Sequence, residues 1–357
     1  MIAPLLPKYG VTRVADVTGL DVLRVPVAMA VRPLARTLSV SQGKGQTLLL
    51  AKVSAAMESV EFWHAEFNHP RSAHRQVPAR ALRLPYRIDQ LTSGPDALVT
   101  EDTPMDWVDA IGLCTGARVA VPARGLTVPV DQYSWFPPGL PWNTNGLASG
   151  NTRAEASLHA LYEVIERDAV TRRAAAASVV YIKPASVSDP SCAELIERVV
   201  AAGAVLRIIR VPSRFEVPCF GATVWSQDFP VTCFGWGAHL DAGVAVSRAV
   251  TEAVQSRLTA IAGSRDDLPP VYAQVRSNTD EPPPVKGAVF GWTDVENVRP
   301  ESFDDLDEEL AWVSSRVTEV TGVEPLCVDL STVAEFAVVK VLAPGAAFNV
   351  DRVHSLR

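Results

Sequence analysis

Cysteine is scarce in this sequence, and the few cysteines stand far apart. The 357 residues include five of them, none in a C-x-x-C pair: Cys114, Cys192, Cys219, Cys233 and Cys327. Zinc sites and disulfide frameworks need cysteines at close or regular spacing. The sequence therefore predicts neither, and we expect these residues to be structural.

Long apolar runs and clusters of positive charge are also lacking. No segment reaches membrane-spanning length, and residues 1–10 lack the charged stretch and apolar run of a signal peptide. The formal net charge of −7 and the absence of any run of Lys or Arg argue against phosphate neutralisation. We therefore expect a cytoplasmic protein with no membrane contact and no nucleic-acid partner.

Hydrophobic residues make up 48% of the chain, which is enough to bury a sizeable core. We expect one domain over residues 1–357, with possible subdomains at 1–67, 68–263 and 264–357. Helices are predicted at 48–67, entered through Gly43-Lys44-Gly45, at 152–173, at 243–262 before Gly263, and near 306–321. Strands are predicted within 14–31, at 205–211, at 219–225 and near 336–342, and residues 68–141 should form strands and loops. The pattern indicates a mixture of helices and sheets.

The first long helix carries a pair of carboxylates on one face. Glu58 and Glu61 are three residues apart, so they project from the same side about one turn from each other. A solvated face is the ordinary explanation for such a pair. Ser54 and Ala65, however, share the same arc and leave room for a ligand.

The second long helix carries a longer acidic stripe. At about 100° per residue, one arc holds Asn151, Glu155, Glu163 and Glu166, and Arg167 borders it. Leu158, Leu161 and Ile165 occupy the opposite side and should face the core. Periodicity alone also fits an exposed helix. Two acidic stripes make chemical sense if Mg²⁺ lies between them, because this ion binds through carboxylates, water and substrate phosphates.

A phosphate-binding loop is the alternative for the stretch Gln42-Gly43-Lys44-Gly45-Gln46-Thr47. The Walker pattern requires Gly where Leu38 stands and Ser or Thr directly after Lys44, where Gly45 stands. The stretch therefore fails that pattern, although backbone amides at a helix start can still meet a phosphate.

Three blocks of this sequence resemble the YcaO enzymes, and the resemblance spans most of the chain. The first block is Ser39-Val40-Ser41-Gln42-Gly43-Lys44-Gly45 leading to Ser54-Ala55-Ala56-Met57-Glu58-Ser59-Val60-Glu61. The second runs from Gly146-Leu147-Ala148-Ser149-Gly150-Asn151 to Tyr162-Glu163-Val164-Ile165-Glu166-Arg167-Asp168. The third is Thr251-Glu252-Ala253-Val254-Gln255-Ser256-Arg257. The resemblance implies an α+β fold in which long helices pack on β-sheets, with the ATP site between them.

The resemblance also implies site residues. The magnesium ligands would be Glu58, Glu61, Glu155, Glu163 and Glu166. Asn151 and Arg167 would contact the nucleotide or metal-bound phosphate, Gln255 and Arg257 would complete the nucleotide pocket, and Arg265 would reach phosphate. The residues expected to act in catalysis are Glu163, Glu166 and Arg167.

In this family a nucleophile adds to a peptide-bond carbonyl and ATP phosphorylates the resulting oxygen. The resemblance thus implies an enzyme that uses ATP and Mg²⁺ to modify a ribosomally made precursor peptide, installing a thioamide, an azoline or an amidine. The chain ends without a Pro-x-Pro-x-Pro tail, which favours a thioamide and a TfuA-like partner over azoline formation by the usual route. A leader-peptide-binding partner and a homodimer are further expectations.

Two other hypotheses stay open at this point. The sequence starts just after the place where many relatives have a segment with phosphate-contacting Lys and Ser or Thr, and Lys8 is a weak substitute. A nucleotide-binding accessory subunit that does not turn over ATP is therefore the first alternative. The second is an α/β protein that binds a small metabolite and whose acidic stripes are solvated.

Overall fold

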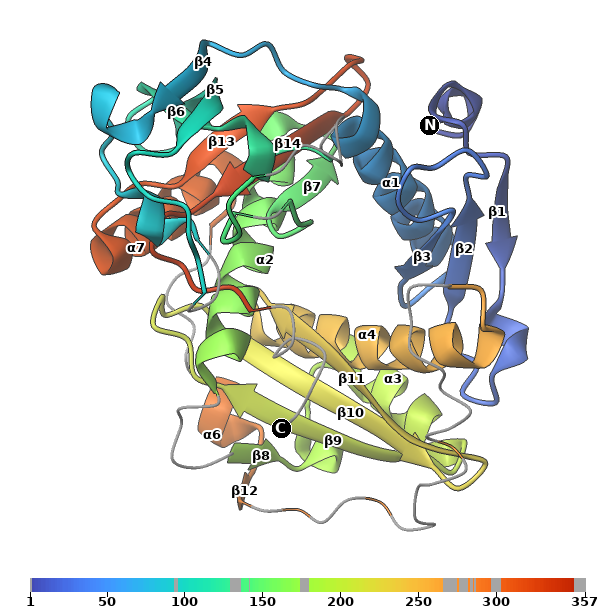
Figure 1. Ribbon diagram of the computed structural model, residues 1–357. Helices are drawn as coiled ribbons and strands as arrows, with labels where there is room; N and C mark the ends of the chain where they lie inside the picture. Colours follow the sequence, from blue (N-terminus) through green and yellow to red (C-terminus); the bar gives the residue numbers. More distant parts are fainter. Residues whose placement is uncertain are drawn as a thin grey trace.

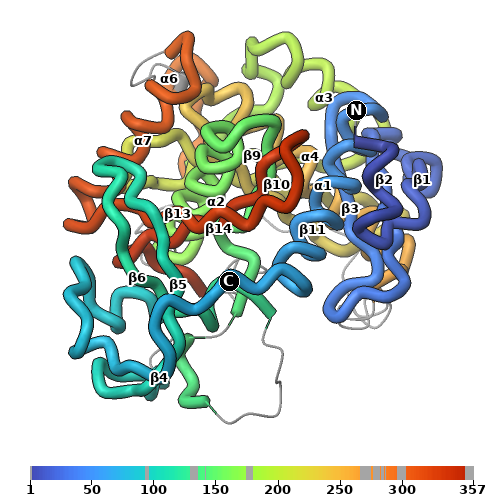
Figure 2. Tube along the Cα trace, turned by 90° about the horizontal axis from the view of Figure 1, so that it is seen from above, coloured from blue at the N-terminus to red at the C-terminus, as the bar shows by residue number. Residues whose placement is uncertain are grey.

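The structure is a computed structural model, and it describes residues 2–92, 96–128, 136–140, 142–173, 180–265, 287–296 and 303–349, with the single residues 275, 282 and 285. Its strands form three β-sheets, and its long helices lie between and upon them (Figure 1). Figures 1 and 2 both place the three-stranded sheet and strands β4–β6 at opposite ends of the molecule.

The N-terminal sheet is antiparallel, with the order β1 (Arg13–Asp16), β2 (Val27–Val31) and β3 (Val40–Lys44). Helix α1 (Leu48–Phe67) follows β3 after three intervening residues and packs back on β2 and β3. The Thr47 side chain caps this helix by accepting a hydrogen bond from the Leu50 amide at 3.3 Å. Strand β3 thus leads directly into the helix that carries the first carboxylate pair.

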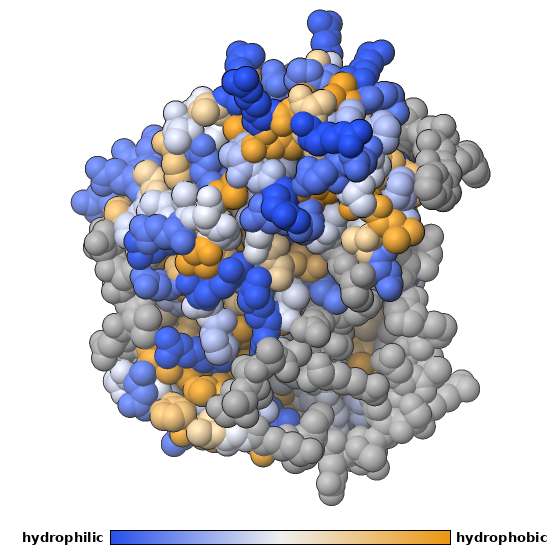
Figure 3. Space-filling model, turned by 60° about the vertical axis from the view of Figure 1, so that its left-hand side comes forward, coloured by the Kyte–Doolittle hydropathy of each residue, from blue (hydrophilic) through white to orange (hydrophobic). Residues whose placement is uncertain are grey.

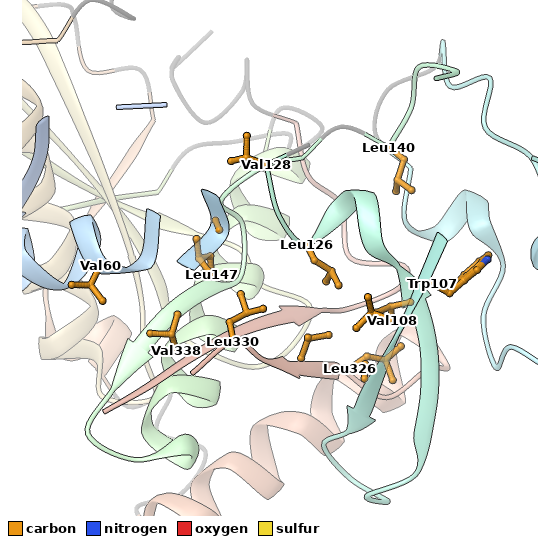
Figure 4. Packing of buried hydrophobic residues seen from close by; sticks show 14 of the residues in the cluster. Val60, Trp107, Val108, Leu126, Val128, Leu140, Leu147, Leu326, Leu330 and Val338 are labelled. Atoms are coloured by element: carbon orange, nitrogen blue, oxygen red, sulfur yellow. The ribbon is translucent and has the colours of Figure 1, made fainter. Parts of the chain in front are cut away.

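The six-stranded sheet combines strands from distant parts of the chain. Its order is β4 (His74–Pro78), β5 (Pro104–Gly112), β13 (Leu326–Asp329), β14 (Ala337–Leu342) and β7 (Leu147–Gly150), with β6 (Arg118–Pro122) also paired to β5. The C-terminal strands therefore lie inside a sheet whose other members come from residues 68–263. One side of the sheet belongs to a buried cluster that includes Val60 of α1, Trp107, Leu147, Leu326 and Val338 (Figure 4).

The five-stranded sheet has the order β11 (Phe229–Ala238), β10 (Cys219–Ser226), β9 (Val205–Val211), β8 (Val180–Ile182) and β12 (Ala288–Phe290). Helices α3 (Pro190–Ala201) and α4 (Ala242–Ala262) cover one face. Helix α2 (Arg153–Arg173) covers the other face and also packs on β14, so it lies between two sheets (Figure 1). Further α-helices among the described residues are α6 (Thr293–Glu296) and α7 (Leu306–Thr321). The short 3₁₀ helices are η1 (Ala3–Tyr9), η2 (Thr18–Leu20), η3 (Ala79–Ala81), η4 (Ile88–Gln90), η5 (Ala123–Gly125) and η6 (Pro184–Ser186).

Glycine allows the strands beside the long helices to come very close to them. A Cβ added at Gly43 of β3 would lie 2.0 Å from the Ala55 nitrogen of α1, and one added at Gly235 of β11 would lie 2.2 Å from the Ala249 oxygen of α4. No side chain fits at either position. Gly43 therefore serves close packing between a strand and a helix.

The predicted long helices and strands are confirmed, with ends within one or two residues of those expected. The predicted core residues Leu158, Leu161 and Ile165 of α2 are buried. Two features differ from expectation. Gly43 and Lys44 belong to strand β3, because Gly43 pairs with Ala28 across the sheet. Helix α3 was not expected, although Asp189 caps it and Pro190 opens it, both of which are signals of a helix start.

The surface of the side that carries β4, β6 and α7 is mainly hydrophilic, with scattered hydrophobic residues (Figure 3). Among the described residues, no helix combines the length and the apolar character needed to cross a membrane.

Candidate functional site

A cavity of about 2090 Å³ lies between the three long helices α1, α2 and α4 and the strands β3, β7 and β11. Pockets for single small molecules usually measure about 300 to 1000 Å³, so this cavity has room for more than one ligand. Its walls include almost all of the residues that the sequence analysis selected: Glu58, Glu61, Asn151, Glu155, Glu163, Glu166, Arg167, Gln255 and Arg265.

The two carboxylates of α1 are held by groups from neighbouring strands. Glu58 Oε2 accepts a hydrogen bond from the Gln42 amide at 2.7 Å, and Glu61 Oε1 accepts one from the Ser149 hydroxyl at 2.5 Å. Burial raises the pKa of Glu58 to about 7. Burial, together with the charges of Glu58 and Glu163, raises the pKa of Glu61 to about 8. Neither carboxylate has an ion-pair partner within 4 Å in the described part of the chain. A bound cation would supply the missing charge.

On α2, Arg167 lies between two carboxylates. Its Nε is 3.7 Å from Glu163 Oε1 and its Nη1 is 3.5 Å from Glu166 Oε1, distances that fit ion pairs but are long for hydrogen bonds. Within the described residues, Arg167 Nη1 is buried and makes no hydrogen bond. Burial raises the pKa of Glu163 and of Glu166, the latter to about 7, although Arg167 opposes the rise. A buried donor without an acceptor is costly, and a phosphate oxygen is a fitting acceptor for Arg.

Glu155 stands at the first turn of α2, where Asn151 positions it. The Asn151 backbone amide and its side-chain Nδ2 each donate to Glu155 Oε2 at 2.9 Å. Asn151, just before the helix, and Glu155, in its first turn, are therefore joined by hydrogen bonds at the cavity wall.

Helix α4 contributes Gln255, whose Nε2 donates to the Gln42 carbonyl at 3.3 Å. The Thr259 hydroxyl donates to Gln42 Oε1. Arg265, just beyond this helix, also lines the cavity, and its positive charge acts to lower the pKa of Glu58. The structure thus places Gln255 and Arg265 on the wall of the same cavity as the carboxylates.

Arg257 does not line the cavity, which corrects its predicted placement. Its side chain is fully buried, with Nε 3.1 Å from Asp21 Oδ2 and Nη2 3.2 Å from Asp228 Oδ2. Two residues along a helix turn the side chain by about 200°, so Arg257 points away from the side that carries Gln255. Its ion pairs hold α4 against the segments around Asp21 and Asp228.

Sequence reasoning missed an ion pair at the cavity wall. Lys44, at the end of β3, forms an ion pair with Glu252 of α4. Burial alone would raise the pKa of Glu252, but Lys44 and Arg167 together lower it. The failed phosphate-loop pattern drew attention to Lys44, yet only the fold shows that it faces Glu252.

A second missed contact joins α2 and α4. Both terminal nitrogens of Arg248 lie 3.2 Å from His159 Nε2. Partial removal from water and the Arg248 charge lower the pKa of His159, so the neutral ring accepts these hydrogen bonds. His159 lies four residues from both Glu155 and Glu163 on α2, and that periodicity was the available signal.

The carboxylates and the arginine that line the cavity fit a magnesium ion that also binds a phosphate ligand. Among the described residues, no three His, Cys, Asp or Glu side chains approach closely enough to hold a metal by themselves. Mg²⁺ seldom needs such a cage, because it usually binds one or two carboxylates together with water and substrate phosphates. Carboxylates on α1 and α2, with an Arg167 Nη1 that has no hydrogen-bond acceptor among the described residues, suit that arrangement.

Comparisons with known proteins agree with the geometry. The model of a family described as "YcaO cyclodehydratase, ATP- and Mg²⁺-binding" matches residues 42–347. An uncharacterized protein of Mycobacterium tuberculosis is 40% identical over 371 residues, which cover 98% of this chain and 80% of the relative. A Rhizobium leguminosarum bv. trifolii protein, described as lying in the tfuA 3′ region, is 38% identical over 288 residues, covering 75% of this chain and 67% of its own.

A solved structure also resembles this one over nearly its whole length. It is that of YcaO from Methanopyrus kandleri bound with AMPPCP and Mg²⁺, with a TM-score of 0.71 and 26% sequence identity, and the match covers 99% of this chain and 92% of that one. The resemblance seen in the sequence motifs is thereby confirmed. Since the family model spans most of the chain and the fold agrees, this chain belongs to the YcaO family.

Proposed function

We propose that this protein is an ATP-dependent enzyme that phosphorylates a backbone amide oxygen in a ribosomally synthesised precursor peptide. One observation supports this above the others: carboxylates from α1 and α2 that are largely removed from water line one large cavity together with basic side chains. The family is described as binding ATP and Mg²⁺, and a relative was solved with AMPPCP and Mg²⁺. The other expected class, a small-metabolite protein with solvated acidic stripes, does not explain carboxylates that line a cavity.

In this proposal the carboxylates hold magnesium and the basic and amide groups hold the nucleotide. The magnesium ligands are Glu58 and Glu61 from α1 with Glu155, Glu163 and Glu166 from α2. The nucleotide and its phosphates contact Asn151, Arg167, Gln255 and Arg265. Arg167 Nη1 has no hydrogen-bond acceptor among the described residues and is free to donate to a phosphate oxygen.

The chemistry requires a poor leaving group to be made a good one. When bound, ATP would transfer its γ-phosphoryl group to the former amide oxygen after a nucleophile has added to the carbonyl carbon, with ADP as the leaving group, and magnesium would neutralise charge on the phosphates. That oxygen could then leave as phosphate. Glu163 and Glu166 keep the metal-bound phosphates in position, and Arg167 between them stabilises negative charge that develops on the transferred group. The peptide or an external donor provides the nucleophile, so these residues need not attack the carbonyl themselves.

The product is proposed to be a thioamide or an azoline or amidine ring. The relative from the tfuA region supports a TfuA-like partner and, with it, thioamide formation. A leader-peptide-binding partner, a homodimer and action in the cytoplasm complete the proposal.

Nucleotide binding is tested by thermal unfolding with ATP, with and without Mg²⁺. Ligand at about 100 times its Kd stabilises the native state by about 2.7 kcal/mol, and this gain should require Mg²⁺ and disappear in Glu163→Gln. The matched control is Glu194→Gln, which changes an exposed carboxylate of α3 outside the cavity. No magnesium-dependent stabilisation of the wild-type protein would contradict the proposed site.

Turnover is tested with a precursor peptide whose amide oxygen carries a heavy isotope. The proposed reaction transfers that oxygen to inorganic phosphate, which mass spectrometry detects. Loss of one water from the peptide would identify ring formation, and exchange of oxygen for sulfur would identify a thioamide. Nucleotide binding without any labelled phosphate would favour the accessory-subunit alternative.

A further inference from the structure

The side of α1 that faces the cavity carries two parallel rows of side chains. At about 100° per residue the rows occupy adjacent arcs of the helix, and both line the cavity. We call Ser54, Glu58 and Glu61 the acidic row and Leu50, Val53 and Met57 the apolar row. The carboxylates assigned to magnesium therefore stand directly beside a strip of hydrophobic surface.

Two members of the apolar row are unusually open to solvent for large hydrophobic side chains. Leu50 is 54% exposed and Val53 is 41% exposed, while Ala51 and Ala55 of the same helix are fully buried. Isolated exposed hydrophobic residues need no explanation, but a contiguous strip inside a ligand cavity is a mark of binding. Met57, the third member, is partly buried and packs against the core, so Leu50 and Val53 form the open part of the strip.

Aromatic side chains continue the apolar surface beyond the row. Phe62 of α1 and Trp142 line the same cavity, with ring centroids 6.5 Å apart, and Phe336 lines it as well. Within the described residues, the Trp142 Nε1 donor is buried and has no hydrogen-bond partner. Buried indole N–H groups normally find an acceptor. A ligand with a carbonyl oxygen would supply one.

We propose that the apolar row and Trp142 bind the substrate peptide as an extended segment with apolar side chains next to the amide that is modified. The inference rests on the proposed function. The cavity is about twice the upper size of an ordinary small-molecule pocket, so nucleotide and peptide fit side by side. The acidic row holds the magnesium and phosphates, and the adjacent apolar row places a peptide bond beside them.

The chemistry of the two rows also selects the peptide. Leu50, Val53 and Met57 offer only apolar contact, so apolar peptide side chains are favoured there over polar ones. The peptide backbone provides the carbonyl oxygen that Trp142 Nε1 lacks. An alternative occupant is a second copy of this chain, but continuity of the row with the carboxylate site favours the substrate.

The test compares two labelled peptides by fluorescence anisotropy, with Mg²⁺ and a non-hydrolysable ATP analogue present. One has the sequence Gly-Val-Leu-Cys-Gly-Val-Leu, and the other has Ser in place of each Val and Leu. Wild-type protein should prefer the apolar peptide by about tenfold, which corresponds to roughly 1.4 kcal/mol. Leu50→Ser combined with Val53→Ser should abolish that preference while magnesium-dependent stabilisation by ATP persists.

Two further variants distinguish loss of the proposed peptide contacts from a general effect of mutation on the protein. Leu49 is 72% exposed on the same helix but does not line the cavity, so Leu49→Ser should keep the wild-type preference. Trp142→Phe keeps a ring beside Phe62 but removes the N–H, so both peptides should bind several-fold more weakly.

Several results would overturn the inference. These are no binding of either peptide, equal binding of both by the wild-type protein, or an equal effect of Leu49→Ser and Leu50→Ser. A loss of dimer in the Leu50 and Val53 variant, with unchanged peptide binding, would assign the row to contact between copies. If the wild-type protein is not stabilised by ATP and Mg²⁺, the proposed function itself fails, and this is measured separately from the peptides.

Discussion

Binding of magnesium and ATP should release protons from the cavity carboxylates. Burial raises the pKa of Glu61 to about 8 and the pKa of Glu58 and Glu166 to about 7 in the metal-free protein. A carboxylate must lose its proton to coordinate a metal ion. Near neutral pH these three groups hold protons that the metal displaces.

The magnitude follows from the three pKa values. At about pH 7, Glu61 is mostly protonated and Glu58 and Glu166 are each about half protonated, so full coordination should release roughly two protons per protein. Glu61→Gln should reduce the release by about one proton. At about pH 9 all three groups are ionised beforehand, and the release should approach zero.

Calorimetric titration measures this directly when it is repeated in buffers that differ in ionisation enthalpy. The slope of the binding enthalpy against the buffer enthalpy equals the number of protons released. The exposed-carboxylate variant Glu194→Gln should behave as the wild type. A slope of zero near neutral pH, with intact magnesium-dependent binding, would refute the assignment of these carboxylates as buried metal ligands.

The same groups set the direction of a stability change with pH. Their pKa values are higher in the folded protein than the ordinary value of 4.5, so the folded state binds more protons than the unfolded state between about pH 4.5 and pH 8. The stability of the metal-free protein should therefore fall as the pH rises through this window. Mg²⁺ with ATP should stabilise the protein more strongly at the alkaline end.

Two further predictions concern stability. Arg257→Met leaves Asp21 buried without its cation and should lower the free energy of unfolding by about 3 to 5 kcal/mol in urea titrations; lost ATP binding with unchanged stability would contradict this structural role. Gly43→Ala places a Cβ 2.0 Å from the Ala55 nitrogen and should cost about 1 to 3 kcal/mol in the same titration. The control Gly125→Ala, where a Cβ meets no atom within 4 Å, should change little, and equal effects of the two would count against the packing argument.

Much of the site was predictable because helical periodicity is a local property. Glu58 and Glu61 on α1, and Glu155, Glu163 and Glu166 on α2, share helix faces whatever the fold around them. The motif resemblance then named magnesium and ATP as the ligands. The structure brings these five carboxylates to one cavity.

Other assignments depended on information that periodicity does not contain. Arg257 belongs to the same motif as Gln255, yet it turns to the far side of α4 and pairs with Asp21, which is more than 200 residues away along the chain. The ion pair of Lys44 with Glu252 also joins distant positions. Contacts of this kind arise only when the sheets have been assembled.

The sequence by itself determined the long helices, the acidic stripes and the family, because helix propensity, capping and side-chain spacing act over a few residues. Only the tertiary structure decided which faces meet. Strands β13 and β14 insert between β5 and β7, and α2 packs between two sheets, so that its acidic stripe faces that of α1. The apolar row shows the same division. The spacing of its residues is set by the helix alone. Its exposure in the cavity depends on the tertiary structure, because the described segments that pack around α1 do not cover Leu50 and Val53.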